Sequence, residues 1–223
     1  MRADSRRAIA EGWPILLTVS VAGLAFGLAA RQNGLSVAEA AGMSLFIFAG
    51  ASQFAAAELA GRGAPAPLIV ATVLFVNLRH LLMAVSLRPH LATITGPRRL
   101  LAAYVLTDEA FAMGIREARR GGRGAAFYLT FAVALWSIWN LATLAGAALA
   151  SGTIDAARFG LDYAIAGTFI AIVVLGVRGR PDVAVALAAA LIAAALRLAG
   201  FPLIATIAAG ALAPLVAVAW RER

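Results

Sequence analysis

Apolar runs of roughly 20 residues, long enough to cross a bilayer as helices, follow one another along this chain. Only short polar segments separate them. The composition agrees, because 62% of the residues are hydrophobic and 13% are charged, whereas a soluble domain carries about 25% charged residues. The sequence therefore predicts an all-α, polytopic membrane protein in which residues 1–223 form a single integral membrane domain.

Turn and capping residues divide the chain into about seven or eight predicted transmembrane helices. Ser36 and Glu39, for example, have the spacing of a capping box at the start of a helix, and Gly96-Pro97 marks the start of another. The predicted helices cover residues 14–30, 37–59, 66–87, 98–117, 125–150, 160–177, 182–198 and 202–219. Gly23 and Gly27 give the first of them a small-residue face of the kind that packs against a neighbouring helix.

A weak internal similarity relates two parts of the chain. Ala49-Gly50 matches Ala166-Gly167, and Leu78-Arg79 matches Leu196-Arg197 at nearly the same separation. This spacing would give two parallel halves, and an inverted repeat is an equally open alternative.

The net charge of +8 comes from arginines in the loops between apolar runs. Because they do not gather on one polar face, membrane orientation explains the charge better than nucleic-acid binding does. With the N-terminus inside, the inner segments hold twice as many arginines as the outer segments, which predicts that both termini are cytoplasmic. Arg88, Arg98 and Arg99 fall on the outer side in this topology and are its exceptions.

Polar residues interrupt two of the predicted helices, as Asn77-Leu78-Arg79-His80 and as Thr107-Asp108-Glu109. A charged side chain in mid-helix costs roughly 2.5–3.5 kcal/mol in hydrocarbon, so it needs a partner. At 1.5 Å per residue, the two clusters lie at similar depths in antiparallel helices. We therefore expect the guanidinium of the first cluster to pair with Asp108 or Glu109.

Two interpretations of this ion pair are open. It either fixes helix packing or forms part of a transport pathway, which is where intramembrane charges usually occur. Asp108 and Glu109 point about 100° apart on a helix, so one can face Arg79 while the other titrates. His80 could share the proton or serve only as a hydrogen-bonded packing residue.

A second cluster lies in the predicted helix 37–59, at Phe48-Ala49-Gly50-Ala51-Ser52-Gln53-Phe54. Its small residues either form a notch in which another helix packs or let the helix open locally. An opened turn would expose backbone groups to a zwitterionic ligand, as in transporters with discontinuous helices.

Motifs of enzymes and of cofactor sites are absent from the sequence. It has no phosphate-binding loop, no zinc-ligand spacing, no nucleophile elbow and no cysteine. We therefore expect a protein that is not an enzyme, has no cofactor or metal, and does not use ATP directly.

Four segments in the first half of the chain resemble the AzlC (YgaZ-type) family. They are Gly23–Gly34, Phe48–Phe54, Asn77–Met83 and Thr107–Phe111. The second half is similar only in part: Trp139–Gly146 has Ala142 where the family usually has Gly. Leu161–Ala164 is followed by Ala166 where Pro is common.

This resemblance implies an exporter of branched-chain amino acids (Leu, Ile and Val) in the inner membrane of a prokaryote. It also implies a small membrane partner of the AzlD (YgaH) type, and a homo-oligomer is compatible with it. Proton-coupled secondary transport fits the polar clusters. The alternatives are a passive amino-acid or small-solute channel, and a structural subunit whose partner forms the substrate site.

We assign expected roles to the residues of the two clusters on this basis. Apolar side chains such as Phe48, Phe54 and Phe111 would discriminate among aliphatic substrates by fit. The expected substrate-binding residues are Arg79, Asn77, Gln53, Ser52, Gly50 and Phe54. The expected proton-coupling residues are Asp108, Glu109 and His80.

Overall fold

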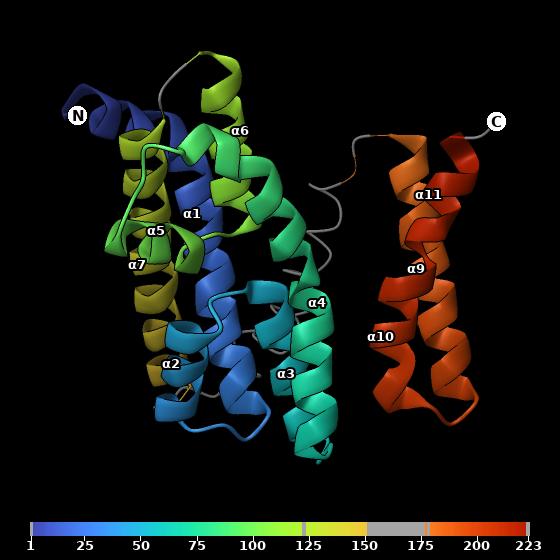
Figure 1. The fold of residues 1–223 in the computed structure, drawn as a ribbon. Helices are drawn as coiled ribbons and strands as arrows, with labels where there is room; N and C mark the ends of the chain where they lie inside the picture. The colour runs from blue at the N-terminus through green and yellow to red at the C-terminus, as the bar shows by residue number, and fades with distance from the viewer. Residues whose placement is uncertain (1, 122–123, 151–176, 178, 222–223) are drawn as a thin grey trace. The chain divides into compact units, whose positions relative to one another are not determined.

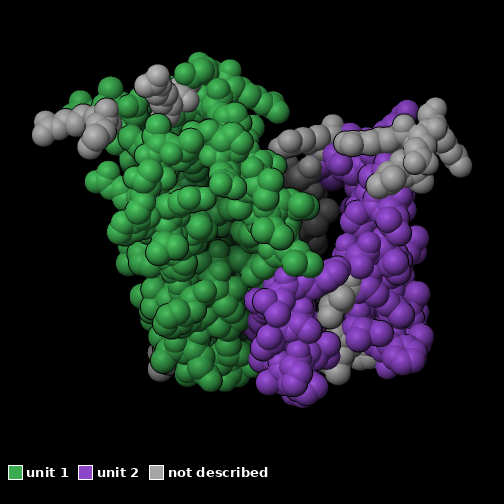
Figure 2. Space-filling model, in the orientation of Figure 1, with its two compact units in different colours: residues 1–54, 77–154 green, residues 55–76, 155–223 purple. Residues whose placement is uncertain are grey.

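The chain is helical throughout its described part in the computed structural model shown in Figure 1. The structure describes residues 2–121, 124–150, 177 and 179–221. The predicted helix 160–177, the Leu161–Ala164 motif and the Ala166-Gly167 part of the parallel repeat lie outside these residues. Two compact units are present, one of residues 1–54 and 77–154 and the other of residues 55–76 and 155–223 (Figure 2).

The helices of the described residues differ in length from those predicted. They are α1 (Arg2–Gln32), α2 (Val37–Phe46), α3 (Gly50–Gly61), α4 (Ala66–Leu87), the 3-10 turn η1 (Arg88–Leu91), α5 (Pro97–Tyr104), α6 (Asp108–Arg119), α7 (Ala125–Leu149), α9 (Arg180–Leu198), α10 (Pro202–Leu212) and α11 (Pro214–Arg221). Among them, the helices of Ala3–Gln32, Ala66–Leu91, Ala125–Leu149 and Arg180–Leu198 are long and apolar enough to cross a bilayer. Three predicted spans, 37–59, 98–117 and 202–219, are each divided into two short helices.

Close packing of α1 against α7 forms the core of the first unit. A Cβ atom on Gly27 would overlap the carbonyl oxygen of Thr143, and one on Gly146 would overlap the carbonyl oxygen of Leu24. Only glycine allows two helix backbones to approach this closely. Contacts advance along both helices together, from Gly12 with Phe131 to Gly27 with Ala147, so α1 and α7 run parallel.

The predicted helix 37–59 turns back on itself. Helix α2 ends at Phe46 and α3 begins at Gly50, and between them Phe48 has a φ of 42°, in the left-handed region. The side-chain amide of Gln53 donates a hydrogen bond of 2.9 Å to the hydroxyl of Ser44. These residues would lie about 13 Å apart along a continuous helix, so α2 and α3 form a re-entrant hairpin (Figure 1).

The predicted helix 98–117 also turns back, between the end of α5 at Tyr104 and the start of α6 at Asp108. Tyr128 on α7 contacts both arms. Its hydroxyl donates a hydrogen bond of 2.8 Å to the carbonyl of Ala102, and its ring lies 3.2 Å from where a Cβ of Gly114 would be. Along one straight helix these two positions would be about 18 Å apart.

The two hairpins enter the first unit from opposite ends (Figure 1). Hairpin α2–α3 follows the C-terminal end of α1, and hairpin α5–α6 follows the C-terminal end of α4, where Leu87 contacts Gly114. A long helix followed by a re-entrant hairpin therefore occurs twice with opposite direction, and α3 and α6 are both 12 residues long. This arrangement is an inverted repeat, the alternative left open by the sequence.

The first hairpin changes the position of three arginines. Because α4 ends beside α6 and the start of α7, Arg88 lies at the same end of the unit as the N-terminus. Arg99 lines the same pocket as Arg88, and Arg98 adjoins it. The predicted topology, which put these arginines at the opposite end, is wrong because the segment 37–59 turns back instead of crossing the unit.

The second unit contains residues 55–76, from α3 and α4, together with α9, α10 and α11. Ala205, Ala209 and Ala213 are buried, and their spacing of four residues places them on one face of a helix. Arg197, in the last turn of α9, donates a hydrogen bond of 3.0 Å to Glu58, which also pairs with Arg62 at 2.6 Å.

Candidate functional site

The tips of the two re-entrant hairpins meet at Tyr104, which is 43% exposed. The hydroxyl of this tyrosine donates to the carbonyl of Leu45 at the end of α2 and accepts a hydrogen bond of 2.9 Å from the indole of Trp136. Its ring lies 6.4 Å from the ring of Phe48, the residue in the left-handed conformation. Irregular backbone at membrane depth is tolerated only where protein or a polar cavity surrounds it, and here each break packs against the other.

The predicted ion pair between the polar clusters is present. A guanidinium nitrogen of Arg79 lies 3.0 Å from a carboxylate oxygen of Asp108. The two side chains are 40% and 48% exposed, so the ion pair lies at the surface of the chain. The Nε of Arg79 and the Oδ1 of Asn77 are buried and have no hydrogen-bond partner among the described residues. Each of these atoms therefore has an unused hydrogen-bonding capacity.

The sequence had predicted that Asp108 and Glu109 lie in the middle of a helix. In the structure they begin one instead. Both lie in the first turn of α6, and Thr107 is its N-cap, with a hydroxyl that accepts from the backbone N–H of Ala110 at 3.3 Å. The positive end of the helix dipole stabilises carboxylates at this position. His80 is half-buried, and its Nδ1 lies 3.2 Å from the carbonyl of Asn77 in the preceding turn.

The predicted site residues of the first hairpin form a buried hydrogen-bonded network. Ser44 lies at its centre: it accepts from Gln53 at 2.9 Å and from the indole of Trp139 at 3.1 Å, and donates to Thr143 at 2.9 Å. The Gln53 carbonyl also accepts from the backbone N–H of Ala49 at 3.1 Å, beside the break. These bonds satisfy the amide of Gln53 and hold the hairpin in its turned conformation.

The remaining predicted residues of this hairpin pack around the network. Ser52 is fully buried and donates to the carbonyl of Ala49 at 2.9 Å. Phe54 is buried, with its ring edge-on to Phe26 at 5.3 Å. A Cβ on Gly50 would lie 2.9 Å from the indole of Trp139. The structure thus gathers the predicted site residues into two groups, one around the Arg79–Asp108 pair and one around the first break.

Sequence reasoning missed Ser44, Thr143 and Tyr104. Each is a single polar residue in an apolar run, a pattern that is common in membrane helices and indicates no partner. Tyr104 carried the clearest signal, because the polar end of a phenol in such an apolar run usually finds a hydrogen-bond partner.

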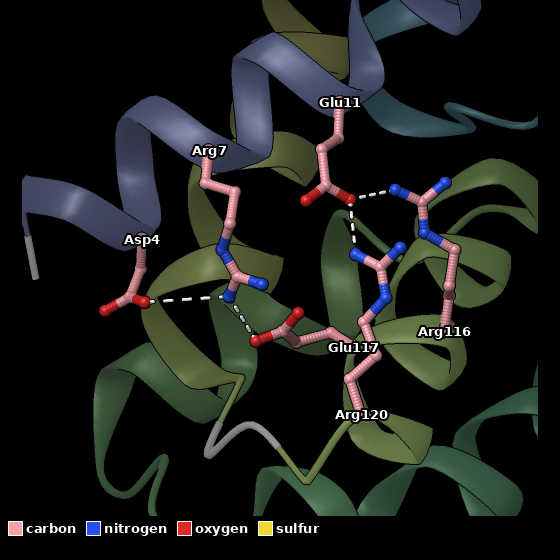
Figure 3. Close-up of polar contacts among 6 residues, drawn as sticks. All are labelled: Asp4, Arg7, Glu11, Arg116, Glu117 and Arg120. Carbon is pink, nitrogen blue, oxygen red and sulfur yellow. Dashed lines mark hydrogen bonds and ion pairs between the residues drawn. The ribbon is translucent and has the colours of Figure 1, made fainter.

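A cluster of charged residues joins the start of α1 to the end of α6 (Figure 3). Arg7 donates to Glu117 and lies 3.7 Å from Asp4. Glu11 accepts from Arg116, and from Arg120 at 2.8 Å. These arginines were visible in the sequence only as topology signals, because their partners are more than a hundred residues away.

Glu117 is the most enclosed member of the cluster. Its side chain is 4% exposed, and one carboxylate oxygen has no hydrogen-bond partner among the described residues. The guanidinium of Arg7 that pairs with it lies 5.0 Å from the centre of the Phe127 ring, in range of a cation–π interaction. The cluster therefore attaches α6, the second arm of hairpin α5–α6, to α1. Among the described residues, no group of histidine and acidic side chains could hold a metal ion.

The fold and this site define a class, the helical integral membrane proteins with a polar interior built from broken helices. The family model of the AzlC protein matches residues 14–152, and the chain belongs to the AzlC family. This match confirms the resemblance found in the sequence.

Its relatives are membrane proteins of bacteria and an archaeon. The chain is 28% identical to the inner membrane protein YgaZ of Escherichia coli K12, over 95% of this chain and 89% of that protein. It is 29% identical to an uncharacterized membrane protein of Archaeoglobus fulgidus, over 95% and 93%. A membrane protein of Helicobacter pylori J99 is 31% identical over 66% and 67%. No solved structure matches the chain.

Proposed function

We propose that this protein is a secondary transporter that exports branched-chain amino acids across the inner membrane of a prokaryotic cell. The observation that carries the proposal is the meeting of two discontinuous helices at Tyr104 and Phe48, with an accessible Arg79–Asp108 pair at the start of α6. In secondary transporters, broken helices of inverted repeats form the substrate site near the middle of the bilayer. The mechanism involves no covalent catalysis.

Substrate binding uses the polar groups around the second break. Arg79 exchanges Asp108 for the carboxylate of the amino acid, and its Nε has no hydrogen-bond partner among the described residues. Asn77 offers to the substrate ammonium an amide oxygen that likewise has no partner in the described part of the chain. Asp108, once released, takes up the coupling proton, with Glu109 and His80 as the neighbouring groups that share it.

The residues of the first break act on the shape of the site. The hydrogen bonds of Ser52 and Gln53 are directed within the protein, so their part in the proposal is to hold the backbone around Gly50 in its open conformation. The rings of Phe48 and Phe54 then set the space for an aliphatic side chain, in which each methylene is worth about 1–3 kcal/mol.

Orientation follows from the arginines of the first unit. At the end where α1 begins lie Arg2, Arg6, Arg7, Arg88, Arg98, Arg99, Arg116, Arg119 and Arg120, whereas Arg31 lies at the other end. By the positive-inside rule the N-terminus is cytoplasmic. The re-entrant path thus brings Arg88, Arg98 and Arg99, the exceptions of the predicted topology, to the inner side. We place the C-terminus on the cytoplasmic side as well.

We also propose a small membrane partner of the AzlD type. A homo-oligomer is compatible with this partner, and both expectations come from the family resemblance. Co-purification of the two chains tests the partner. If the chain alone in liposomes neither binds nor moves leucine while the pair does, the partner forms the substrate site.

Isotope-labelled leucine flux into everted vesicles tests the transport proposal. Arg79→Ala and Asp108→Asn should each abolish flux, because each leaves the other charge unpaired in the pathway. Arg6→Ala, at an exposed arginine on α1, is the matched control and should transport normally. Unaltered flux in both site variants would remove the pair from the mechanism. Flux that persists after the pH gradient is collapsed would indicate a passive channel.

A further inference from the structure

A separate pocket of about 480 Å³ opens where α4 passes through η1 into α5. Its lining is of two kinds. Arg88, Thr95 and Arg99 supply two guanidinium groups and a hydroxyl, while Val85, Leu91 and Ile94 supply apolar surface. None of these residues belongs to the proposed substrate site.

No other described residue compensates the charge of this pocket. Arg88 and Arg99 form no ion pair with another described residue, and the sequence contains no acidic residue between Glu58 and Asp108. Arg98 and Arg99 also occupy the first turn of α5, at the positive end of the helix dipole, where a carboxylate is normally favoured. An anion bound between the guanidinium groups would relieve this repulsion.

An apolar stripe on α4 leads into the same pocket. Leu78, Leu81, Leu82 and Val85 are all exposed, and their spacing of three and four residues places them on one face of the helix. The stripe ends at Val85, which lines the pocket beside Arg88. A ligand that fills both surfaces must combine an anionic group with a long hydrocarbon chain.

We propose that this pocket binds an anionic phospholipid, with its phosphate between Arg88 and Arg99 and an acyl chain along the exposed stripe of α4. Basic pockets at the cytoplasmic ends of membrane helices bind lipid head groups in this way. The pocket lies at the end of the unit where arginines gather, so the lipid belongs to that leaflet. The site does not depend on which substrate the protein transports.

Lipid binding to the purified full-length protein tests the proposal. Native mass spectrometry in detergent would measure the dissociation constant for phosphatidylglycerol, with phosphatidylcholine as the zwitterionic comparison. The unaltered protein should bind phosphatidylglycerol more tightly than phosphatidylcholine. The double variant Arg88→Gln, Arg99→Gln should weaken its binding at least about tenfold, because each arginine contributes about 1 kcal/mol to an anionic lipid. The control Arg6→Gln, Arg62→Gln removes the same charge elsewhere and should leave binding unchanged.

Two further arms separate the possible ligands. Inorganic phosphate and glycerophosphate at millimolar concentration should not displace the lipid, since they lack the chain that covers α4. If they do displace it, the pocket is a site for free phosphate and the lipid proposal is wrong. Equal affinity for both phospholipids, or full affinity in the Arg88, Arg99 variant, would also overturn it. Arg88→Lys, Arg99→Lys keeps the charge and should restore most of the binding, which guards against a folding defect.

Discussion

Single glycines decide how closely the helices of the first unit can pack. The α1–α7 contact depends on Gly27 and Gly146, whose Cα hydrogens face carbonyl groups of the other helix. The neighbour in each case is backbone, which cannot rotate away as a flexible side chain would. A methyl group at either position must therefore separate the two helices.

Gly146→Ala should lower the free energy of unfolding by about 1–3 kcal/mol, the usual cost of overpacking. Thermal unfolding in detergent measures this effect. The matched control is Gly42→Ala in α2, where an added Cβ meets no atom within 4 Å. Alanine should stabilise that helix by about 0.5–1 kcal/mol. If Gly146→Ala is as stable as the control, the two backbones are not in contact.

At the scale of elements, hairpin α5–α6 is fixed at both of its ends. Its tip is held by Tyr104 against the first hairpin, and its outer end by the charged cluster on α1. The two attachments differ in their physics. The first consists of neutral hydrogen bonds and ring contacts, whereas the second consists of ion pairs that range from exposed to enclosed.

The Arg7–Glu117 pair should show a coupling energy well above that of a surface ion pair. A double-mutant cycle with Arg7→Gln and Glu117→Gln should give about 1–3 kcal/mol, because Glu117 is enclosed although Arg7 is partly exposed. The comparison is the pair of Glu58 and Arg62, one helical turn apart and exposed, for which about 0.3–0.5 kcal/mol is expected. Equal coupling in the two cycles would contradict an enclosed pair.

At the scale of the whole molecule, the re-entrant hairpins reduce the number of crossings and change which loops share a side. The chain has no cysteine, so each introduced cysteine is a single labelling site. His90 follows α4, and an eight-span path would place it opposite the N-terminus. With hairpins, it lies on the side of the N-terminus.

His90→Cys should be modified by a membrane-impermeant thiol reagent from the same side as Ser5→Cys. Asn33→Cys, after α1, should be modified only from the other side. Everted and right-side-out vesicles distinguish the two sides. Modification of His90→Cys from the same side as Asn33→Cys would restore a full crossing by residues 37–59 and remove the inverted repeat.

Some features of the site followed from the sequence because they depend on short distances along the chain. The capping box of Ser36 and Glu39 is present as predicted. The meeting of Arg79 with Asp108 could also be predicted, since a charge in hydrocarbon needs a partner and the next polar cluster was the nearest one. That prediction is confirmed even though the predicted helix is interrupted at Thr107, because the interruption lies immediately before Asp108.

The breaks themselves could not be placed with certainty from the pattern of residues. A run of about 20 apolar residues serves equally for one helix that crosses the bilayer and for two half-helices that return. Ala49 and Gly50 indicated that opening was possible, but a packing notch explained them as well. The N-cap Thr107 was a local signal for the second break, and it lacks the glutamate that would have completed a capping box.

The sequence by itself determined that this chain is helical, lies in a membrane and pairs Arg79 with Asp108, because hydropathy and isolated charges impose these features locally. The tertiary structure alone decided that two helices break and turn back. Ser44, Gln53, Trp139 and Thr143 must be brought together before the turned backbone has its hydrogen bonds. These hydrogen bonds join residues about a hundred positions apart, so no local pattern in the sequence predicts them.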